Sequence, residues 1–450
     1  MRALLPACTA GLVFSIMATS CATQSGPRED ALWREYRGLA AADRPPGVQT
    51  FAVGTALDRE ALVTAVLARN PSVAAARAGL RAGLAEIEQA RALEDPMLAY
   101  ELAPLSIAGD APFGQTVSLR QKLPFPGKRR LAGEVALAMA EAEAAEIDVV
   151  RLELAQLASE LYDDLYVVAR ALEINAHHEG LLEQIKKSAE AQYVAGRAAQ
   201  QDPIQAEVAL AQLERERITI EAERDQIVAR INGLLHRPPA ANLPAPPTDL
   251  TLAGAPTGTS AQLQELALRR RPQRAAASAR IGVARAQLAA ANRDFYPDFE
   301  LMGSYNSMWD MTAHRWMVGV MIDVPIQRGK RRAAVEQAEA RIARARFEDE
   351  RLVDEIRVAV DRAHRSVSEA EALVRVYTDK LLPASRAQVD AARAGFTSAQ
   401  NSFLAVVDAQ KNLREVELSL AMARAELSRR KAALARTVGV VPGLREGGTP

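Results

Sequence analysis

The chain has few of the residues from which an ordinary globular core is built. Only 4% of its 450 residues are aromatic, whereas 25% are charged. Its 56 acidic residues balance its 56 Lys and Arg, so it lacks the excess positive charge that favours binding to nucleic acid or anionic lipid surfaces. Alanine-rich runs of alternating charge take the place of large side chains, and such runs favour long, closely packed helices.

Cysteine is almost absent, because only Cys8 and Cys21 occur. Residues 1–20 combine the basic Arg2 with an apolar run at 11–17, which is the pattern of a bacterial secretory signal. The residues before Cys21 are similar to a lipoprotein-processing box, although Ala18 stands where Leu is commoner. We predict that Cys21 becomes the acylated mature N-terminus, the alternative being a chance cysteine behind a plain signal. Either way, a single mature cysteine excludes an internal disulfide.

The sequence also lacks an enzyme signature. No Gly-rich phosphate loop stands between a strand and a helix, so the chain is not predicted to couple ATP hydrolysis to work. His177 and His178 are adjacent, about 100° apart on a helix, which is not the i, i+4 spacing of a metal pair; we expect both on a solvated helix surface. We therefore expect no catalytic residue, no metal site and no cofactor.

A two-fold internal repeat organises the chain. Three segments of one half reappear in the other at offsets of 201, 201 and 202 residues: 70–77 as 271–278, 94–98 as 295–299, and 127–130 as 329–332. The repeat predicts the following division: 1–20 signal peptide, 21–54 lipid-anchored N-terminal extension, 55–235 first repeat, 236–258 Pro-rich extended connector, 259–439 second repeat and 440–450 C-terminal tail.

The hydrophobic period changes twice within each repeat. Two short helices come first, the earlier one over 57–70 and its counterpart over 261–271. Residues then alternate with a period of two, which predicts two strands per repeat: 97–102, 116–123, 298–305 and 316–324. Long helical patterns follow, running out over 128–194 and back over 203–235 in the first repeat, and out over 331–394 with an interruption at Pro383 and back over 402–438 in the second. The first of these would reach roughly 100 Å at 1.5 Å per residue.

The strands predict either a small half-buried sheet or part of a membrane barrel. Strands of about 9–11 residues are long enough to cross a bilayer when tilted. Four strands are too few to close a barrel, and an open edge is not tolerated in lipid. A membrane barrel would therefore require several chains to contribute four strands each.

Four further segments carry a family resemblance: 123–128 (LPFPGK), 193–206 (YVAGRAAQQDPIQA), 234–238 (LLHRP) and 402–410 (SFLAVVDAQ). Together with the duplication they resemble the TolC-like outer-membrane factors, the outer membrane efflux protein family, over about 380 residues. The resemblance is to the lipoprotein branch associated with heavy-metal and cation efflux.

The resemblance implies a mainly α fold with a small β part, in which a homotrimer closes one 12-stranded barrel and a periplasmic α-helical tunnel. It implies a passive exit duct in the outer membrane, with Ala22 after Cys21 typical of lipoproteins sorted there. The implied partners are outer-membrane lipid, a periplasmic adaptor and an inner-membrane pump of the proton-driven resistance-nodulation-division type, with metal cations among the implied substrates; no nucleic acid is implied.

The family also supplies candidate gate residues at the two hairpin tips. The first tip carries Tyr193, Gly196 and Asp202 at the family's positions, and the second carries Phe396, Ala399, Asn401 and Asp408. Relatives hold the tip shut with a Tyr at the position of Phe396 and a basic residue at that of Asn401, and both are replaced here. Tyr193 and Gly196 are equally interpreted as turn residues, whereas Asp202 and Asp408 are predicted to line the mouth as rings of negative charge.

Three interpretations remain open. Five methionines fall within one strand pair (Met302, Met308, Met311, Met317 and Met321), and thioethers either ligate soft ions such as Cu(I) and Ag(I) or simply fill apolar surface. A periplasmic adaptor of an export complex would need one hairpin flanked by β-rich domains, which the duplication disfavours. A structural coiled-coil protein would lack the alternating strands.

Overall fold

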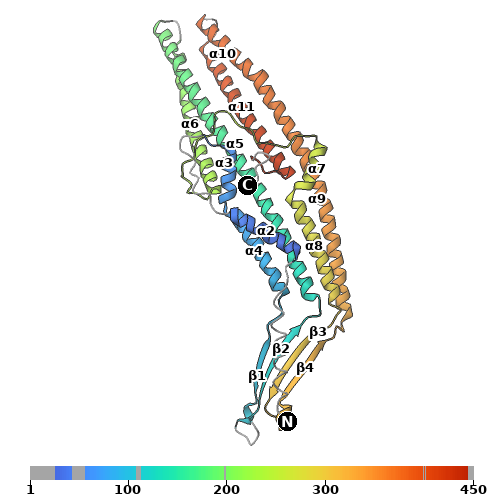
Figure 1. The fold of residues 1–450 in the computed structure, drawn as a ribbon. Coiled ribbons are helices and arrows are strands. Elements are labelled where there is room, and N and C mark those ends of the chain that lie inside the picture. The colour runs from blue at the N-terminus through green and yellow to red at the C-terminus, as the bar shows by residue number, and fades with distance from the viewer. Residues whose placement is uncertain are drawn as a thin grey trace. The chain divides into compact units, whose positions relative to one another are not determined.

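The computed structural model describes residues 26–42, 56–107, 113–196, 199–398, 400 and 402–443 (Figure 1). The chain separates into two compact units, and each takes segments from both repeats. The strand unit comprises the described residues of 1–41, 77–145 and 275–350. The helical unit comprises those of 42–76, 146–274 and 351–450.

The strand unit contains one antiparallel sheet, whose strands follow the chain in the order β1-β2-β3-β4. Their bounds are β1 Met97–Leu102, β2 Gln115–Leu123, β3 Asp298–Asn306 and β4 Trp316–Asp323. Single 3₁₀ turns, η1 (Pro104–Ser106) and η2 (Thr312–His314), lie between the strands of each pair. The prediction of two strands per repeat is confirmed, and the β2–β3 pairing joins the two repeats into one sheet.

The rest of the strand unit is helical. It includes α2 (Pro27–Ala42), most of α4 (Pro71–Arg91) and α8 (Pro272–Arg293), and the first parts of α5 (Lys128–Val194) and α9 (Arg328–Val376). Helix α2 was not predicted from the sequence. It is held by an ion pair in which Arg91 donates to the buried Glu29 at 2.5 Å, and by Arg28, which pairs with Glu141 of α5.

The junction between β2 and α5 has a defined geometry. Gly127 takes φ +96°, a left-handed conformation that glycine adopts without steric cost. The Arg293 guanidinium lies 5.0 Å from the ring centre of Phe125 and donates to the carbonyl of Pro126. Lys128 at the start of α5 donates to Asp298 at the start of β3, 2.9 Å away. These contacts fix where the strands end and the long helices begin.

The helical unit contains an antiparallel hairpin from each repeat. Its remaining elements are α3 (Arg59–Arg69), α6 (Gln201–Leu234), α7 (Ser260–Arg270), the π-helical turn η3 (Tyr377–Leu381), α10 (Leu382–Thr397) and α11 (Phe403–Val438). The bounds of α5 agree with the predicted 128–194. Residues 236–258, between the two repeats, contain neither helix nor strand.

The predicted interruption at Pro383 takes the form of a π turn rather than a break. Proline has no N–H for the helical hydrogen bond and its ring crowds the preceding turn. Widening one turn to the i→i+5 pattern accommodates both, and η3 is that turn. The outgoing helix of the second repeat therefore continues through it into α10.

Each short helix closes an apolar core of its own repeat. In the first, Leu62 of α3 lies in a buried cluster with Ala158 and Leu165 of α5 and Ile231 of α6. The second repeat reproduces the cluster with these residues: Leu263 of α7, Val360 and Val367 of α9 and Leu434 of α11. The two repeats thus share their packing as well as their order of elements.

Candidate functional site

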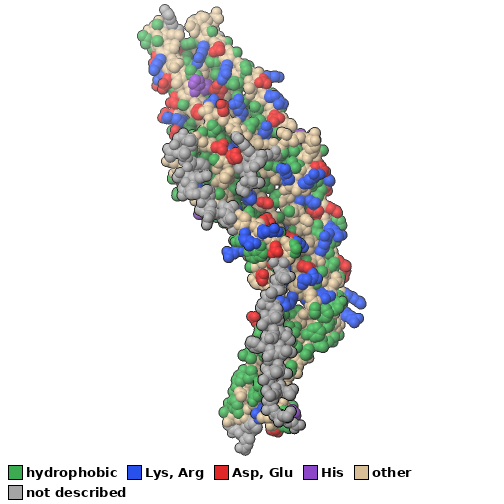
Figure 2. All heavy atoms as spheres, viewed as in Figure 1, with side chains coloured by type: hydrophobic (Ala, Val, Ile, Leu, Met, Phe, Trp, Pro, Cys, Tyr) green, Lys and Arg blue, Asp and Glu red, His purple; other side chains and the backbone are tan. Residues whose placement is uncertain are grey.

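The sheet separates apolar from polar side chains onto opposite faces. Its pairing places Leu119 of β2 opposite Leu98 of β1, and Leu301 of β3 opposite Val320 of β4. The apolar face comprises Leu98, Tyr100, Val117, Leu119, Leu301, Tyr305, Trp316, Val318, Val320 and Ile322. This face is exposed, with Val318 at 90% of its maximum, and Figure 2 shows hydrophobic side chains gathered over the sheet. An exposed apolar face of this extent requires a non-aqueous neighbour.

The opposite face carries polar groups together with methionines. In the strand register, Arg120 lies opposite Met302, and Lys122 lies opposite Glu300. Of the five methionines identified in the sequence, Met302, Met317 and Met321 share this polar face, while Met308 and Met311 lie in the connection between β3 and β4. Met302 is paired with Gly319, which leaves room for its methyl group. The methionines are thus divided between two places.

The first hairpin tip is a short turn. Helix α5 ends at Val194, and Gly196 takes φ +68°, which accounts for glycine at this position. The amide of Gly196 donates to the carbonyl of Tyr193, whose side chain is 44% exposed. Asp202 lies in the first turn of α6, where a carboxylate interacts favourably with the helix dipole.

The second tip is packed against the first through aromatic rings. Ser402 caps α11 by accepting from the amide of Ala405. Phe396 and Phe403 meet edge to face, with ring centres 5.7 Å apart, and Phe403 is buried against Ala189 of α5 and Ala206 of α6. Phe403 was not singled out from the sequence. The available signal was a large apolar residue directly after a serine N-cap.

The remaining predicted tip residues are only partly placed. Asp408 is exposed on α11, one turn beyond Phe403. Ala399 and Asn401 lie outside the described residues, as does Cys21. The structure therefore brings Phe396 and Phe403 together with the first hairpin but does not test a contact between Asn401 and Asp202.

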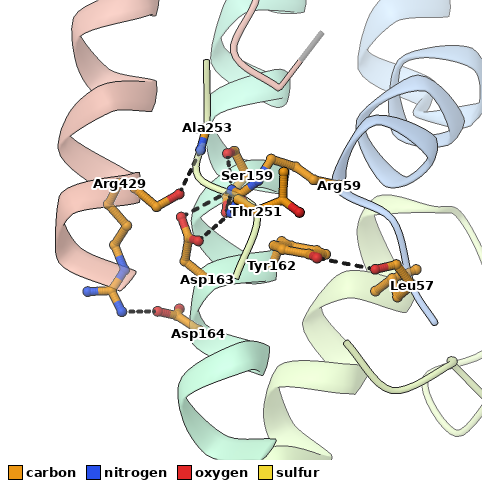
Figure 3. Close-up of polar contacts among 10 residues, drawn as sticks. Leu57, Arg59, Ser159, Tyr162, Asp163, Asp164, Thr251, Ala253 and Arg429 are labelled. Atoms are coloured by element: carbon orange, nitrogen blue, oxygen red, sulfur yellow. Dashed lines mark hydrogen bonds and ion pairs between the residues drawn. The ribbon is translucent and has the colours of Figure 1, made fainter. Parts of the chain in front are cut away.

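A buried polar network at the N-terminus of α3 joins four segments of the helical unit (Figure 3). Arg59 makes a bidentate ion pair with Asp163 of α5, at 2.6 and 3.2 Å, and both side chains are at most 4% exposed. Arg59 also donates to the carbonyl of Thr251 in the connector. The hydroxyl of Ser428 on α11 accepts from the amide of Ala253. The network therefore holds both repeats and the connector together.

The electrostatics of the network follow from its burial. Burial raises the pKa of Asp163, and the hydrogen bonds from Arg59 and Ser428 oppose that shift. Burial also raises the pKa of Tyr162 to about 12, while its hydroxyl donates to the carbonyl of Leu57 at 3.2 Å. The Arg59 guanidinium lies 4.4 Å from the ring centre of Tyr162. A paired, hydrogen-bonded charge of this kind is costly to disrupt.

With this geometry in place, the chain can be compared with known proteins. Residues 263–440 match the family model described as outer membrane efflux protein. The matched residues lie in the second repeat. A comparison with curated proteins finds no match.

Solved structures of outer-membrane channels share the fold of this chain. The outer-membrane channel OprN is 22% identical, with a TM-score of 0.71 over 85% of this chain and 89% of that one. CusC, described for its folding and transmembrane channel formation, is 19% identical with a TM-score of 0.73 over 87% and 96%. VceC of Vibrio cholerae is 18% identical with a TM-score of 0.70 over 85% and 96%. Strand pairs and helical hairpins are thus arranged as in these channels.

One expectation about the long helices is wrong. His178 is buried rather than solvated, and its Nε2 lies 3.0 Å from a carboxylate oxygen of Glu417 on α11. This contact could not be predicted from the neighbouring residues, because Glu417 comes from the other repeat. The hydrogen bond with His178 lowers the pKa of Glu417 against the opposing effect of burial. His177, the neighbouring residue, is exposed as expected.

Among the described residues, none of the helices combines the length and apolar character needed to cross a bilayer. Within the same residues, His, Cys, Asp and Glu form no group of three or more suited to a metal ion. The features that distinguish this part of the chain are therefore the two-faced sheet, the packed tips and the buried network.

Proposed function

We propose that the chain is a channel subunit of the outer membrane, a passive exit duct for substrates delivered from the inner membrane. The observation that carries this proposal is the sheet, with one exposed apolar face, one polar face, and β1 and β4 each paired on one side only within the described residues. Such a sheet is unstable in water and incomplete in lipid. Joining copies edge to edge satisfies both requirements, with the apolar face toward lipid and the polar face toward a water-filled interior.

The number of copies follows from the family rather than from the single chain. Three copies of four strands give the twelve-stranded barrel that the resemblance implies, and their paired helical hairpins give the tunnel. The chain has no catalytic role in this proposal, because the energy is supplied by a pump of the proton-driven resistance-nodulation-division type through a periplasmic adaptor. The lipoprotein branch suggests metal cations among the substrates.

A lipid anchor on Cys21 is the second element of the proposal. It rests on the sequence alone, since residues 18–21 resemble a lipoprotein-processing box. Mass spectrometry of the N-terminal peptide of the mature protein is expected to show a lipid-modified Cys21. An unmodified N-terminus at another residue would rule the anchor out. The protein is still expected to assemble without it, because a closed barrel is itself a membrane anchor.

The tips are the proposed gate, held shut mainly by packing. The contact of Phe403 with Ala189 and Ala206 supports this, because it is buried and joins the two hairpins. A charged pair in an exposed, salt-screened mouth contributes only about 0–1 kcal/mol, in each of three copies. Asp202 and Asp408 are proposed to control cation preference more than closure.

Conductance of the purified protein in planar bilayers tests the function and the gate together. The wild type is expected to form pores, which a protein without a transmembrane channel would not do. Asp408→Asn is expected to weaken cation selectivity, because it removes a ring of negative charge. Asn401→Arg is expected to lower conductance, because an arginine can make a charge-assisted hydrogen bond to Asp202 about twice as strong as a neutral one.

Two results separate the parts of this proposal. If wild-type protein conducts but neither substitution alters selectivity or conductance, the tip residues are not at the constriction. Glu207→Gln, an exposed charge further along α6, serves as the matched control for a general effect of charge. Absence of any conductance from correctly folded protein would contradict the channel itself.

A further inference from the structure

One helix face is covered in the first repeat and open in the second. The face on α5 is fully buried; it comprises Leu152, Ala155, Ser159, Tyr162, Asp163 and Tyr166. The equivalent positions on α9, 202 residues later, are Asp354, Arg357, Asp361, His364, Arg365 and Ser368. All six are at least partly exposed, and the Arg365 side chain is 78% exposed. The offset of 202 residues comes from the apolar cores of the two repeats, in which Ala158 and Leu165 of α5 correspond to Val360 and Val367 of α9.

Part of the cover on α5 comes from α3 of the same repeat, and the rest comes from α11, the return helix of the other repeat. Tyr166 packs with Ala421 and Ala425 in one buried cluster. Ser428 makes a side-chain hydrogen bond with Asp163, and Arg429 pairs with Asp164 at 3.0 Å. An outgoing helix in this fold is therefore completed by a return helix from the opposite repeat.

The return helix of the first repeat has the corresponding face uncovered. Helices α6 and α11 are related by 203 residues, because Ile231 and Leu235 occupy the core places of Leu434 and Val438. The residues equivalent to Ala421, Ala425 and Ser428 are then Ile218, Ala222 and Asp225. All three are exposed, with Ile218 at 61%.

The two uncovered faces have complementary chemistry. The face on α9 borders a groove of about 670 Å³, lined by three arginines and two acidic residues beside the apolar Val358: Arg357, Arg362, Arg365, Asp361 and Glu369. The face on α6 carries the apolar Ile218 and the carboxylate of Asp225, which is exposed and accepts through one oxygen from the neighbouring Arg224 at 3.0 Å. Ser428 contacts Asp163 within one chain. The repeat relation places Asp225 at the position of Ser428 and Arg365 at the position of Asp163. Both residue types differ from those of the first pair, and Asp225 and Arg365 carry opposite charges.

These faces do not meet within one chain. Helix α6 packs into the core of the first repeat through Ile227 and Ile231, whereas α9 packs into that of the second. In the view of Figure 1 they lie on opposite sides of the helical unit, with α5 and α11 between them. A contact between two different surfaces of identical copies closes into a ring when its rotation allows.

We propose that α6 of one copy covers the 354–368 face of α9 in the next copy, with Asp225 beside Arg365. This interface rests on the trimer of the proposed function and names the surface that closes it. The Nε–H of Arg365 already donates to Asp361 at 2.8 Å, and the guanidinium has further N–H donors for a second carboxylate. The packing of α6 on α9 between copies repeats the packing of α11 on α5 within each chain. The helices then pack against one another all the way around the ring.

Cysteine cross-linking in outer membranes tests the interface. A chain carrying both Asp225→Cys and Arg365→Cys, treated with a short bifunctional thiol reagent, is expected to give covalent trimers on denaturing gels, because each copy links to two others. Each single variant is expected to remain monomeric. The matched control combines Arg365→Cys with Glu223→Cys, which lies two residues away and about 200° around α6; it is expected to give no covalent trimer.

Native mass measurement in detergent distinguishes the possible failures. A trimer by native mass with no cross-linking above the control would overturn this interface and leave the channel proposal intact. A stable folded monomer would contradict the trimer itself. A charge exchange gives an independent test: Asp225→Arg and Arg365→Asp alone are each expected to lower the temperature at which the trimer dissociates, and the two together to restore it. No restoration would also overturn the pairing.

Discussion

Asp163→Ala is expected to destabilise the helical unit by about 3–5 kcal/mol, the usual cost of removing one partner of a buried ion pair. The substitution leaves the Arg59 guanidinium, only 4% exposed, without its carboxylate in an interior that excludes water. It also removes the side-chain hydrogen bond with Ser428, which helps to join α5 to α11. The measurement is the midpoint of thermal unfolding, followed by helical circular dichroism.

The internal repeat supplies a matched control for this prediction. Asp361 of α9 makes a similar set of contacts, since it accepts from Ser260 of α7 and from Arg365. Its side chain is 38% exposed in the single chain, so Asp361→Ala is expected to lower the unfolding midpoint of the dissociated chain much less than Asp163→Ala does. Equal shifts of the unfolding midpoint for Asp163→Ala and Asp361→Ala would contradict the role assigned to burial.

A double substitution separates the loss of a pair from the loss of packing. Replacing a buried ion pair with apolar residues of similar volume is often nearly neutral. Arg59→Leu combined with Asp163→Leu is therefore expected to recover most of the stability lost in Asp163→Ala. If the double variant is as unstable as the single one, the hydrogen bonds of Arg59 to Ser159 and Thr251 matter more than the charge pair.

The chain's own periodicities were sufficient to predict its elements. Alternation with a period of two located four strands, and a long helical pattern without proline predicted the bounds of α5, Lys128–Val194. These signals are local, because each depends on neighbouring residues along one strand or helix face. The π turn before Pro383 was not predicted in form, since a proline signals disruption of a helix without specifying how the backbone accommodates it.

The contacts that join the repeats could not be predicted in the same way. Arg59 and Asp163 are 104 residues apart, and His178 and Glu417 are 239 apart. On an Arg- and Glu-rich helix nothing distinguishes a charge that will be buried from its solvated neighbours. Repeat comparison offers a partial signal: Arg59, Ser159 and Asp163 correspond to Ser260, Asp361 and Arg365, so the same three residue types occupy exchanged positions. The exchange marks the position as a polar contact in both repeats.

Val320→Arg is expected to prevent stable insertion of the sheet into the outer membrane. Val320 lies in the middle of β4 on the apolar face, opposite Leu301 of β3, and is 59% exposed in the single chain. An arginine facing lipid near the bilayer midplane costs about 2–4 kcal/mol, and the cost recurs in each of three copies, giving about 6–12 kcal/mol per trimer. The expected result is loss of the heat-modifiable trimer from the outer-membrane fraction.

The next residue along the strand is the control for this experiment. Met321 points to the polar face, where it is opposite Glu300, so Met321→Arg places the same side chain toward a water-filled interior and beside a carboxylate. It is expected to insert at the wild-type level, because its charge stays hydrated. If Val320→Arg and Met321→Arg insert equally well, the apolar face does not contact lipid, and the sheet is covered by protein instead. If only Met321→Arg fails, the two faces are assigned the wrong way round, which would place the methionines rather than the valines toward the membrane.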